Sequence, residues 1–319
     1  MIDPPHAAAA VARWPALPYA EWAETCETLH LWTQVVGKIR LAQTPWQNHS
    51  WHVTLYVTAS GLTTSLIPHG ERSFEIRFDF LRHMLDIAVS DGGARSLPLV
   101  PRSVAEFHDD VMRALDDLGV PVSITDLPCE IPGALPFPVD RTHAAYDAGH
   151  AQRFWHALVD VDRVFKRFRT GFIGKASPVH FFWGSFDLAV SRFSGRRAPL
   201  HPGGAPGTAP AVMQEAYSHE VCSAGFWPGG GGYDASFYSY VYPEPPGYRA
   251  SPVRPPAAAF DAKLGEFVMP YAAVRAAADP AAALLEFLHS TYDAAADHAQ
   301  WDRVNLERAE SVPGRCPWP

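Results

Sequence analysis

The sequence predicts an α+β protein of two divergent units, each with the order helix, antiparallel strands, helix. Apolar residues recur at helical spacing in several long stretches, and between these stretches they alternate with polar residues at the period of a β-strand. The two halves of the chain also run through these elements in the same order. We therefore predict an internal duplication, with units over residues 14–130 and 131–303 and a disordered polar tail over residues 304–319.

The first unit begins with a helix predicted over residues 19–41, whose apolar residues follow the helical repeat. Residues 51–57 then alternate between apolar and polar, which is typical of a half-buried strand. A second helix begins at Ser103, because Glu106 three residues later completes a capping box. The remaining strands of this unit are predicted over residues 62–67, 74–80 and 84–89.

The second unit opens with a helix predicted over residues 147–169. An extended stretch follows over residues 179–193, which Gly184–Ser185 either bends or splits into a hairpin. The last helix begins at Asp279–Pro280, since proline is favoured at the first helical position. Two more strands, over residues 217–227 and 237–242, flank the four-glycine loop at residues 229–232.

One spacing supports the duplication. Lys38 precedes His52 by 14 positions, and Lys166 precedes His180 by the same 14, so that the two pairs differ by a constant offset of 128. In each half the histidine opens the strand predicted after the long helix. We therefore expect the two units to be related by a pseudo-twofold axis.

Composition excludes several classes of protein. The chain has 26 basic against 34 acidic residues, a net charge of −8, which argues against a nucleic-acid partner. Its four cysteines are scattered and form no C-x-x-C pair, which argues against a disulfide framework and a structural zinc site. No stretch reaches the roughly 20 apolar residues of a membrane helix, and the short apolar run at residues 7–11 has no basic segment before it. We expect a cytoplasmic protein.

The aromatic residues gather with histidine and arginine in the second half, over residues 179–193 and 217–242. A guanidinium beside enclosed aromatic rings suits a carboxylate or phosphate, so we predict a pocket for a small anionic ligand. Arg192 shares a strand face with His180 if that strand is continuous. The residues expected to line the pocket are Trp183, Arg192, Arg196, His219 and Trp227, and the candidates for acid–base catalysis are His180, Asp187 and Glu220.

Two alternatives stay open. His180, His219 and Glu220 could form the centre of a metalloenzyme, but neighbours on a strand point to opposite faces, so no metal site is favoured. If instead the histidines and Arg192 are buried apart, the aromatic residues serve only to pack a non-enzymatic interaction or scaffold protein. No nucleophile elbow, P-loop or dinucleotide fingerprint occurs, so no motif indicates a cofactor or a reaction, and the oligomeric state is open.

Several stretches of the chain resemble domain-of-unknown-function family 5996. The longest is residues 177–189, Ser-Pro-Val-His-Phe-Phe-Trp-Gly-Ser-Phe-Asp-Leu-Ala. The resemblance extends from about Trp14 to Trp301. It implies a soluble, mostly bacterial protein, and because the family has no assigned activity it implies no catalytic residue. The other similar stretches are residues 32–38, 48–58, 193–199, 217–220 and 223–229.

Overall fold

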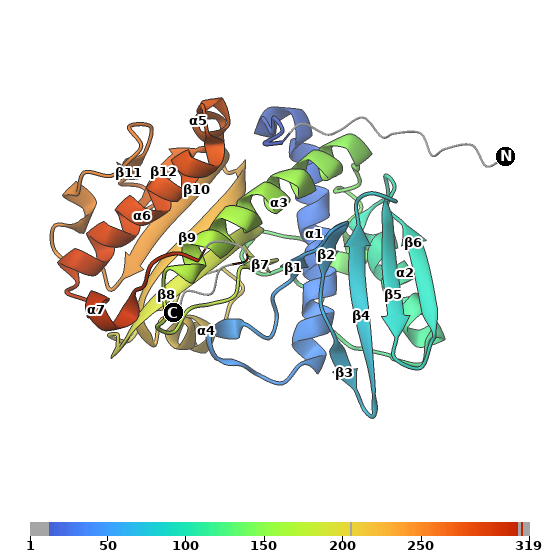
Figure 1. Cartoon of the computed structure of the whole chain (residues 1–319). Coiled ribbons are helices and arrows are strands. Elements are labelled where there is room, and N and C mark those ends of the chain that lie inside the picture. Colours follow the sequence, from blue (N-terminus) through green and yellow to red (C-terminus); the bar gives the residue numbers. More distant parts are fainter. Residues whose placement is uncertain (1–12, 205, 312–313, 315–319) are drawn as a thin grey trace.

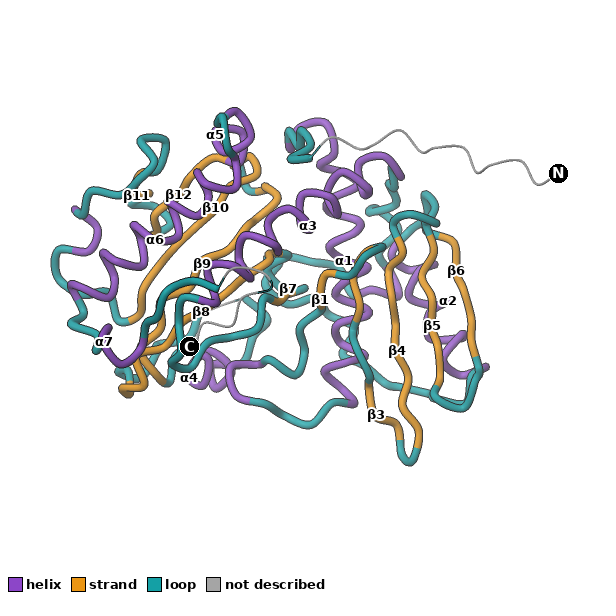
Figure 2. The backbone as a smooth tube through the Cα atoms, viewed as in Figure 1, coloured by secondary structure: helices purple, strands orange, loops and turns teal. Residues whose placement is uncertain are grey.

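A computed structural model describes residues 13–204, 206–311 and 314 of the chain. It contains two six-stranded antiparallel sheets with helices packed against them, which confirms the predicted α+β class. Figure 1 shows the two sheets on opposite sides of the molecule, and Figure 2 shows the long first helix, α1 (Tyr19–Gln43), running between them.

The first sheet has the strand order β1-β2-β4-β5-β6, with β3 paired to β4. Helix α2 (Val104–Asp117) begins with the predicted capping box, in which the Ser103 hydroxyl accepts from the Glu106 amide at 3.2 Å. Phe107 of α2 stacks on Trp32 of α1 at 4.7 Å between ring centroids. The strands are β1 (Tyr56–Val57), β2 (Gly61–Thr63), β3 (Ile67–His69), β4 (Arg72–Asp79), β5 (Met84–Val89) and β6 (Ala94–Pro98).

The second sheet has the strand order β11-β12-β10-β9-β8-β7. Helices α3 (Ala148–Thr170) and α6 (Pro280–His298) cover one of its faces (Figure 1). Its strands are β7 (His180–Phe182), β8 (Asp187–Arg197), β9 (His219–Gly230), β10 (Tyr233–Tyr242), β11 (Ala259–Asp261) and β12 (Glu266–Pro270). The short helices are α4 (Pro210–Ala216), α5 (Tyr271–Ala276) and α7 (Arg303–Leu306), and 3-10 turns span Asn48–Ser50, Phe137–Val139 and Tyr248–Ala250.

The strand predicted over residues 51–57 is wrong for most of its length. Asn48–Ser50 form a 3-10 turn, and only Tyr56–Val57 pair as β1. One backbone acceptor of the segment is used by a distant side chain, because the Trp183 indole donates to the Val53 carbonyl at 2.7 Å. Tertiary contacts of this kind override a local alternation of apolar residues.

Of the two possibilities for residues 179–193, the structure has the hairpin. The chain turns between β7 and β8, and His180 pairs with Ala189. Because side chains alternate along β8, His180 lies on the face of Ala189 and not on that of Arg192. The shared face that a continuous strand would give to His180 and Arg192 is therefore wrong.

The sequence predicts a disordered tail over residues 304–319, and the structure describes this segment as far as residue 311. Helix α7 begins the segment, and Tyr292 of α6 then donates to the Glu307 carboxylate at 2.8 Å. This contact ties the tail to the helices that cover the second sheet. Residues 312–313 and 315–319 lie outside the described residues.

The topology does not confirm the internal duplication. His180 begins β7, whereas His52 lies in a turn outside any strand. The two sheets also differ in strand order. The predicted boundary at residues 130–131 falls between α2 and α3, in a connector whose only regular element is the turn Phe137–Val139.

Trp183 joins the two halves of the molecule. It is only 4% exposed and packs on Gly37 of α1, where a Cβ atom would overlap the indole ring. The absence of a side chain at Gly37 thus lets the turn between β7 and β8 lie against the helix.

Replacing Gly37 should therefore break this junction. We expect Gly37→Ala to lower the free energy of unfolding by about 1–3 kcal/mol or more, because the added methyl group displaces a buried indole. Gly149→Ala, near the start of α3, is the matched control, since its Cβ meets only side-chain atoms at 3.3 Å or beyond. Chemical denaturation of both variants measures the difference, and equal stabilities would contradict the assigned role of Gly37.

Candidate functional site

The two faces of the second sheet differ sharply in character. Alternate residues of β8, among them Leu188 and Val190, are buried beneath α3 and α6, and we call this side the helix face. The opposite side, which we call the polar face, carries partly exposed tyrosine and serine side chains. Its central members are Asp187, Ser191, Ser223, Tyr238 and Tyr240.

Arg192 lies on the helix face and is 2% exposed. Its guanidinium stacks on Phe168 at 3.5 Å and on Tyr292 at 4.3 Å from the ring centroids, and it donates to the Phe168 carbonyl. These contacts occupy the guanidinium in packing α3 and α6 onto the sheet. Arg192 therefore does not form an anion pocket with His180 or His219.

The two candidate histidines are held by local hydrogen bonds. His180 is 1% exposed, with its Nδ1 2.7 Å from the Pro178 carbonyl, and burial lowers the pKa of its imidazole to about 4. His219 Nδ1 lies 3.0 Å from the Ser218 hydroxyl. The structure thus places the two histidines in separate surroundings and does not bring them together as a metal or catalytic pair.

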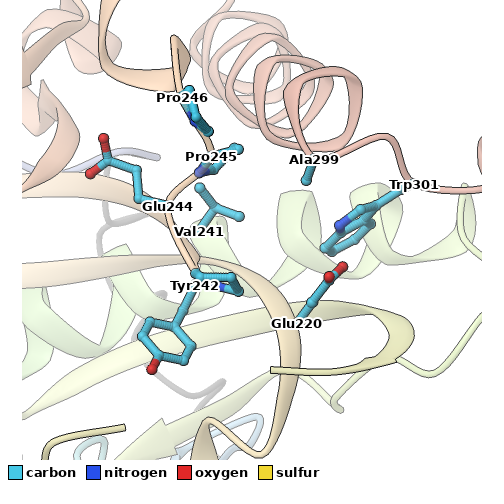
Figure 3. A pocket seen from close by; sticks show the side chains of 9 residues that line it. Glu220, Val241, Tyr242, Glu244, Pro245, Pro246, Ala299 and Trp301 are labelled. Atoms are coloured by element: carbon cyan, nitrogen blue, oxygen red, sulfur yellow. The ribbon is translucent and has the colours of Figure 1, made fainter. Parts of the chain in front are cut away.

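Glu220 follows His219 on β9 and points to the opposite face. Its carboxylate accepts from the Ser194 hydroxyl at 2.8 Å and from Arg196 at 2.7 Å, so the charges of Glu220 and Arg196 are matched. Beside it lies a pocket of about 220 Å³. In Figure 3 the Glu220 carboxylate points toward the indole of Trp301. The pocket is lined by Glu220, Val241, Tyr242, Pro243, Glu244, Pro245, Pro246, Ala299 and Trp301.

The two candidate tryptophans also lie apart. Trp183 is buried in the junction with α1, where its indole nitrogen is occupied by the Val53 carbonyl. Trp227 is partly exposed on β9, with its ring 6.1 Å from that of Tyr233. The pocket residues predicted from the sequence are therefore distributed over both faces of the sheet.

Asp187 is a buried candidate residue that is bonded to other polar and titratable side chains. It is 5% exposed, and its carboxylate accepts hydrogen bonds from the Ser185 and Tyr238 hydroxyls. Tyr238 reaches it from β10 across β9, because Gly225 leaves space under the tyrosine ring where any side chain would collide. Burial raises the pKa of the Asp187 carboxyl, and burial beside Asp187 raises that of the Tyr238 phenol.

Two further carboxyls lie within electrostatic reach of Asp187. Burial and the Asp187 charge raise the pKa of Glu130 to about 7, and the same causes, with Asp261, raise the pKa of Glu266 to about 7. Solvent still reaches the side chains of Glu130 and Glu266. Glu130, Asp187, Glu266 and Tyr238 together form what we call the carboxyl site, which can give or take protons near neutral pH.

Glu130 is brought to this site from the connector between the halves. Gln34 of α1 forms two hydrogen bonds with the Cys129 backbone, accepting from its amide at 2.9 Å and donating to its carbonyl at 2.8 Å. The Glu130 amide donates to the Pro206 carbonyl at 2.7 Å. Glu130 has a left-handed φ of 62°, and Phe186, next to Asp187, has one of 60°. Such strained residues gather at functional sites.

A second group of hydroxyls continues the polar face. The Tyr217 and Tyr240 hydroxyls are 2.9 Å apart, and the Ser191 and Ser223 hydroxyls are also 2.9 Å apart. Asp187 raises the pKa of Tyr217 in addition to burial. The carboxyl site therefore borders an array of hydrogen-bonding groups that solvent can reach.

The described residues contain neither a cluster of metal-binding side chains nor a helix that could cross a membrane. Within residues 13–204, 206–311 and 314, no group of three or more His, Cys, Asp and Glu side chains is placed to hold a metal ion. In that same part of the chain, no helix combines the length and the apolar character needed to cross a membrane.

Comparison with known families identifies the chain. Residues 14–308 match the model of a family of unknown function, DUF5996. The chain belongs to this family. Comparison with curated proteins and with solved structures gave no match. The family assignment confirms the resemblance seen in the sequence, and it leaves the function of this DUF5996 member to be inferred from its geometry.

One pattern in the sequence, the alternating tyrosines of β10, points to the carboxyl site. Tyr238, Tyr240 and Tyr242 alternate with buried residues along β10, so they form a row on one face. An exposed row of tyrosines on a sheet is typical of a binding surface. Glu130 and Glu266 carried no such signal, because neither lies in a recognisable motif.

The raised pKa of Glu266 makes a prediction for stability. In the folded protein this carboxyl has a pKa of about 7, above its unfolded value near 4.5. Its contribution to the free energy of unfolding is therefore fully present below pH 4.5 and is lost as the pH rises through 7. The variant Glu266→Gln removes this pH-dependent loss of stability, because the glutamine side chain does not ionise. We expect the variant to gain about 1–2 kcal/mol relative to the wild type between pH 5 and pH 8, after discounting for partial exposure.

Urea denaturation at the two pH values checks this prediction. The buried His30 and His180, whose pKa values are lowered to about 4, destabilise the fold as the pH falls below 6.5, but they are common to both proteins and cancel in the comparison. Exposed Glu24 of α1 provides the control variant, Glu24→Gln. A constant difference between Glu266→Gln and wild type at both pH values would show that Glu266 is not perturbed.

Proposed function

We propose that the protein binds a small cationic organic molecule at the carboxyl site and exchanges protons with it. The observation that carries this proposal is the buried Asp187 carboxylate, which accepts from the Ser185 and Tyr238 hydroxyls and whose charge, with burial, raises the pKa of both Glu130 and Glu266 on a face that solvent reaches. Keeping such groups together costs stability, and groups of this kind are characteristic of functional sites.

The charge of the site selects the ligand. An anion would add to the repulsion among the carboxylates, whereas an amine relieves that repulsion and favours their ionised forms. The tyrosine rings beside them add faces that attract a cation. This proposal therefore replaces the anionic ligand expected from the arginines, because Arg192 and Arg196 are engaged elsewhere.

The cysteines bear on where the protein is found. Cys26, Cys129 and Cys222 are free thiols, which suits the reducing cytoplasm and supports a cytoplasmic location.

A non-enzymatic scaffold is the second candidate, and one observation favours it. His180 and Arg192, which were expected to line one pocket, are buried apart and each is bonded to a backbone carbonyl. A scaffold needs no perturbed carboxyls, however, so the carboxyl site distinguishes the two functions.

Benzylamine, benzyl alcohol and benzoate form a matched series that tests the proposal, because they share a ring and differ in charge. We expect saturation-transfer NMR at pH 7.5 to show benzylamine binding at least about tenfold more tightly than benzoate. Asp187→Asn should abolish this preference, since it removes the central charge and keeps the shape of the side chain.

Glu220→Gln is the control, because Glu220 lies on β9 but faces away from the carboxyl site. It should bind benzylamine as the wild type does. If benzoate binds more tightly than benzylamine, the anionic ligand expected from the sequence is favoured over a cationic one. If none of the three compounds binds, the scaffold function is favoured.

A further inference from the structure

Lys175 lies beside two aromatic rings at the far end of the polar face. Its ammonium nitrogen is 4.9 Å from the ring centroid of Phe193 and 5.5 Å from that of Trp51. The same nitrogen is 2.6 Å from Nε2 of His49. The 44–55 segment that supplies His49 and Trp51 runs beside α4 (Figure 1). Residues from both halves of the chain therefore surround one amine.

The hydrogen bonds fix the protonation of His49. Its Nδ1 lies 2.8 Å from the Ala216 carbonyl, which can only accept, so Nδ1 carries the proton and Nε2 presents a lone pair to Lys175. His49 is 5% exposed and packs against Phe193 at 4.5 Å between ring centroids. Both His49 and Ser50 have a left-handed φ of 57°. This strained turn holds an acceptor against the lysine.

Lys175 is accessible and lacks a neutralising partner. Its side chain is exposed, and among the described residues no carboxylate lies within ion-pair distance of its nitrogen. Burial lowers the pKa of the Lys175 amine, while the charge of Glu215 raises it in part. Burial, Lys175 and His219 likewise lower the pKa of His49, and Glu215 again opposes them. Loss of a proton is therefore easier for this amine than for an ordinary surface lysine.

We propose that Lys175 is a nucleophile that forms an imine with an aldehyde or ketone, with His49 as its proton acceptor. The ammonium transfers a proton to Nε2 of His49, and the amine attacks the carbonyl carbon to form a carbon–nitrogen bond. The nitrogen of the adduct passes one of its two protons to the oxygen, the carbon–oxygen bond then breaks, and the oxygen leaves as water with the second proton, which His49 returns. The product is a protonated imine, so charge and atoms balance. Trp51 and Phe193 provide apolar surfaces for a ring or chain next to the carbonyl.

This inference is independent of the carboxyl site. Asp187 and Phe193 are six residues apart on β8, which corresponds to about 20 Å along a strand. Lys175 also shares no hydrogen bond with Asp187, Glu130 or Glu266 in the described structure. Failure of either proposal would leave the other standing.

Reductive trapping with 2-hydroxybenzaldehyde and cyanoborohydride tests the proposal on the full chain. The chain has four lysines, Lys38, Lys166, Lys175 and Lys263, so peptide mass spectrometry can follow each one. At pH 7.5 we expect Lys175 to be labelled at least about tenfold faster than the exposed Lys263. Equal rates at these two lysines would overturn the proposal without any variant.

His49→Gln tests the assigned proton acceptor. It should slow labelling of Lys175 to the rate of Lys263, and thermal unfolding confirms that the variant is folded. Lys263→Arg is the control and should leave Lys175 labelling unchanged. Unchanged labelling of Lys175 in folded His49→Gln would overturn the role given to His49.

Discussion

The contact between Trp183 and Gly37 fixes the rest of the arrangement. The indole of Trp183 fills the space that Gly37 leaves on α1, and its N–H group donates a hydrogen bond to the Val53 carbonyl. This places the turn between β7 and β8 against the helix. Asp187 begins β8 directly after that turn, and Gln34 lies one helical turn before Gly37, where it binds the Cys129 backbone. The positions of Asp187 and of the backbone next to Glu130 therefore depend on one close approach between a helix and a turn.

The sequence predicts best what is decided locally. The long helices follow from apolar spacing, and the capping box at Ser103 is a local reciprocal pair of hydrogen bonds. The faces of strands were harder, because a single hairpin turn at Gly184–Ser185 decides whether His180 lies with Arg192 or opposite it. Glu130 could not be found, since its place depends on a left-handed φ and on Gln34, which is 96 positions away in the sequence (130 − 34). The tyrosine row of β10 could have been found, as it follows from alternation alone.

Among the described residues, four of the eight non-glycine residues with a left-handed φ lie at the two ends of the polar face. Glu130 and Phe186 are left-handed beside the carboxyl site, and His49 and Ser50 are left-handed beside Lys175. A bulky residue in that region of conformational space is held there by its surroundings, at a cost of order 1–3 kcal/mol each. Around Glu130 the surroundings are its own hydrogen bond to Pro206 and the bonds of the preceding Cys129 to Gln34, and around His49 they are the bonds to Ala216 and Lys175.

The attachment of Cys129 to Gln34 has a mechanical consequence. Burial, and in second place the charge of Asp187, raises the pKa of Glu130 to about 7, and the residue before it is bonded to α1 of the other half. The burial on which that pKa depends is therefore set partly by where α1 lies against the second sheet. The proton affinity of one carboxyl is in this way coupled to the packing of the two halves.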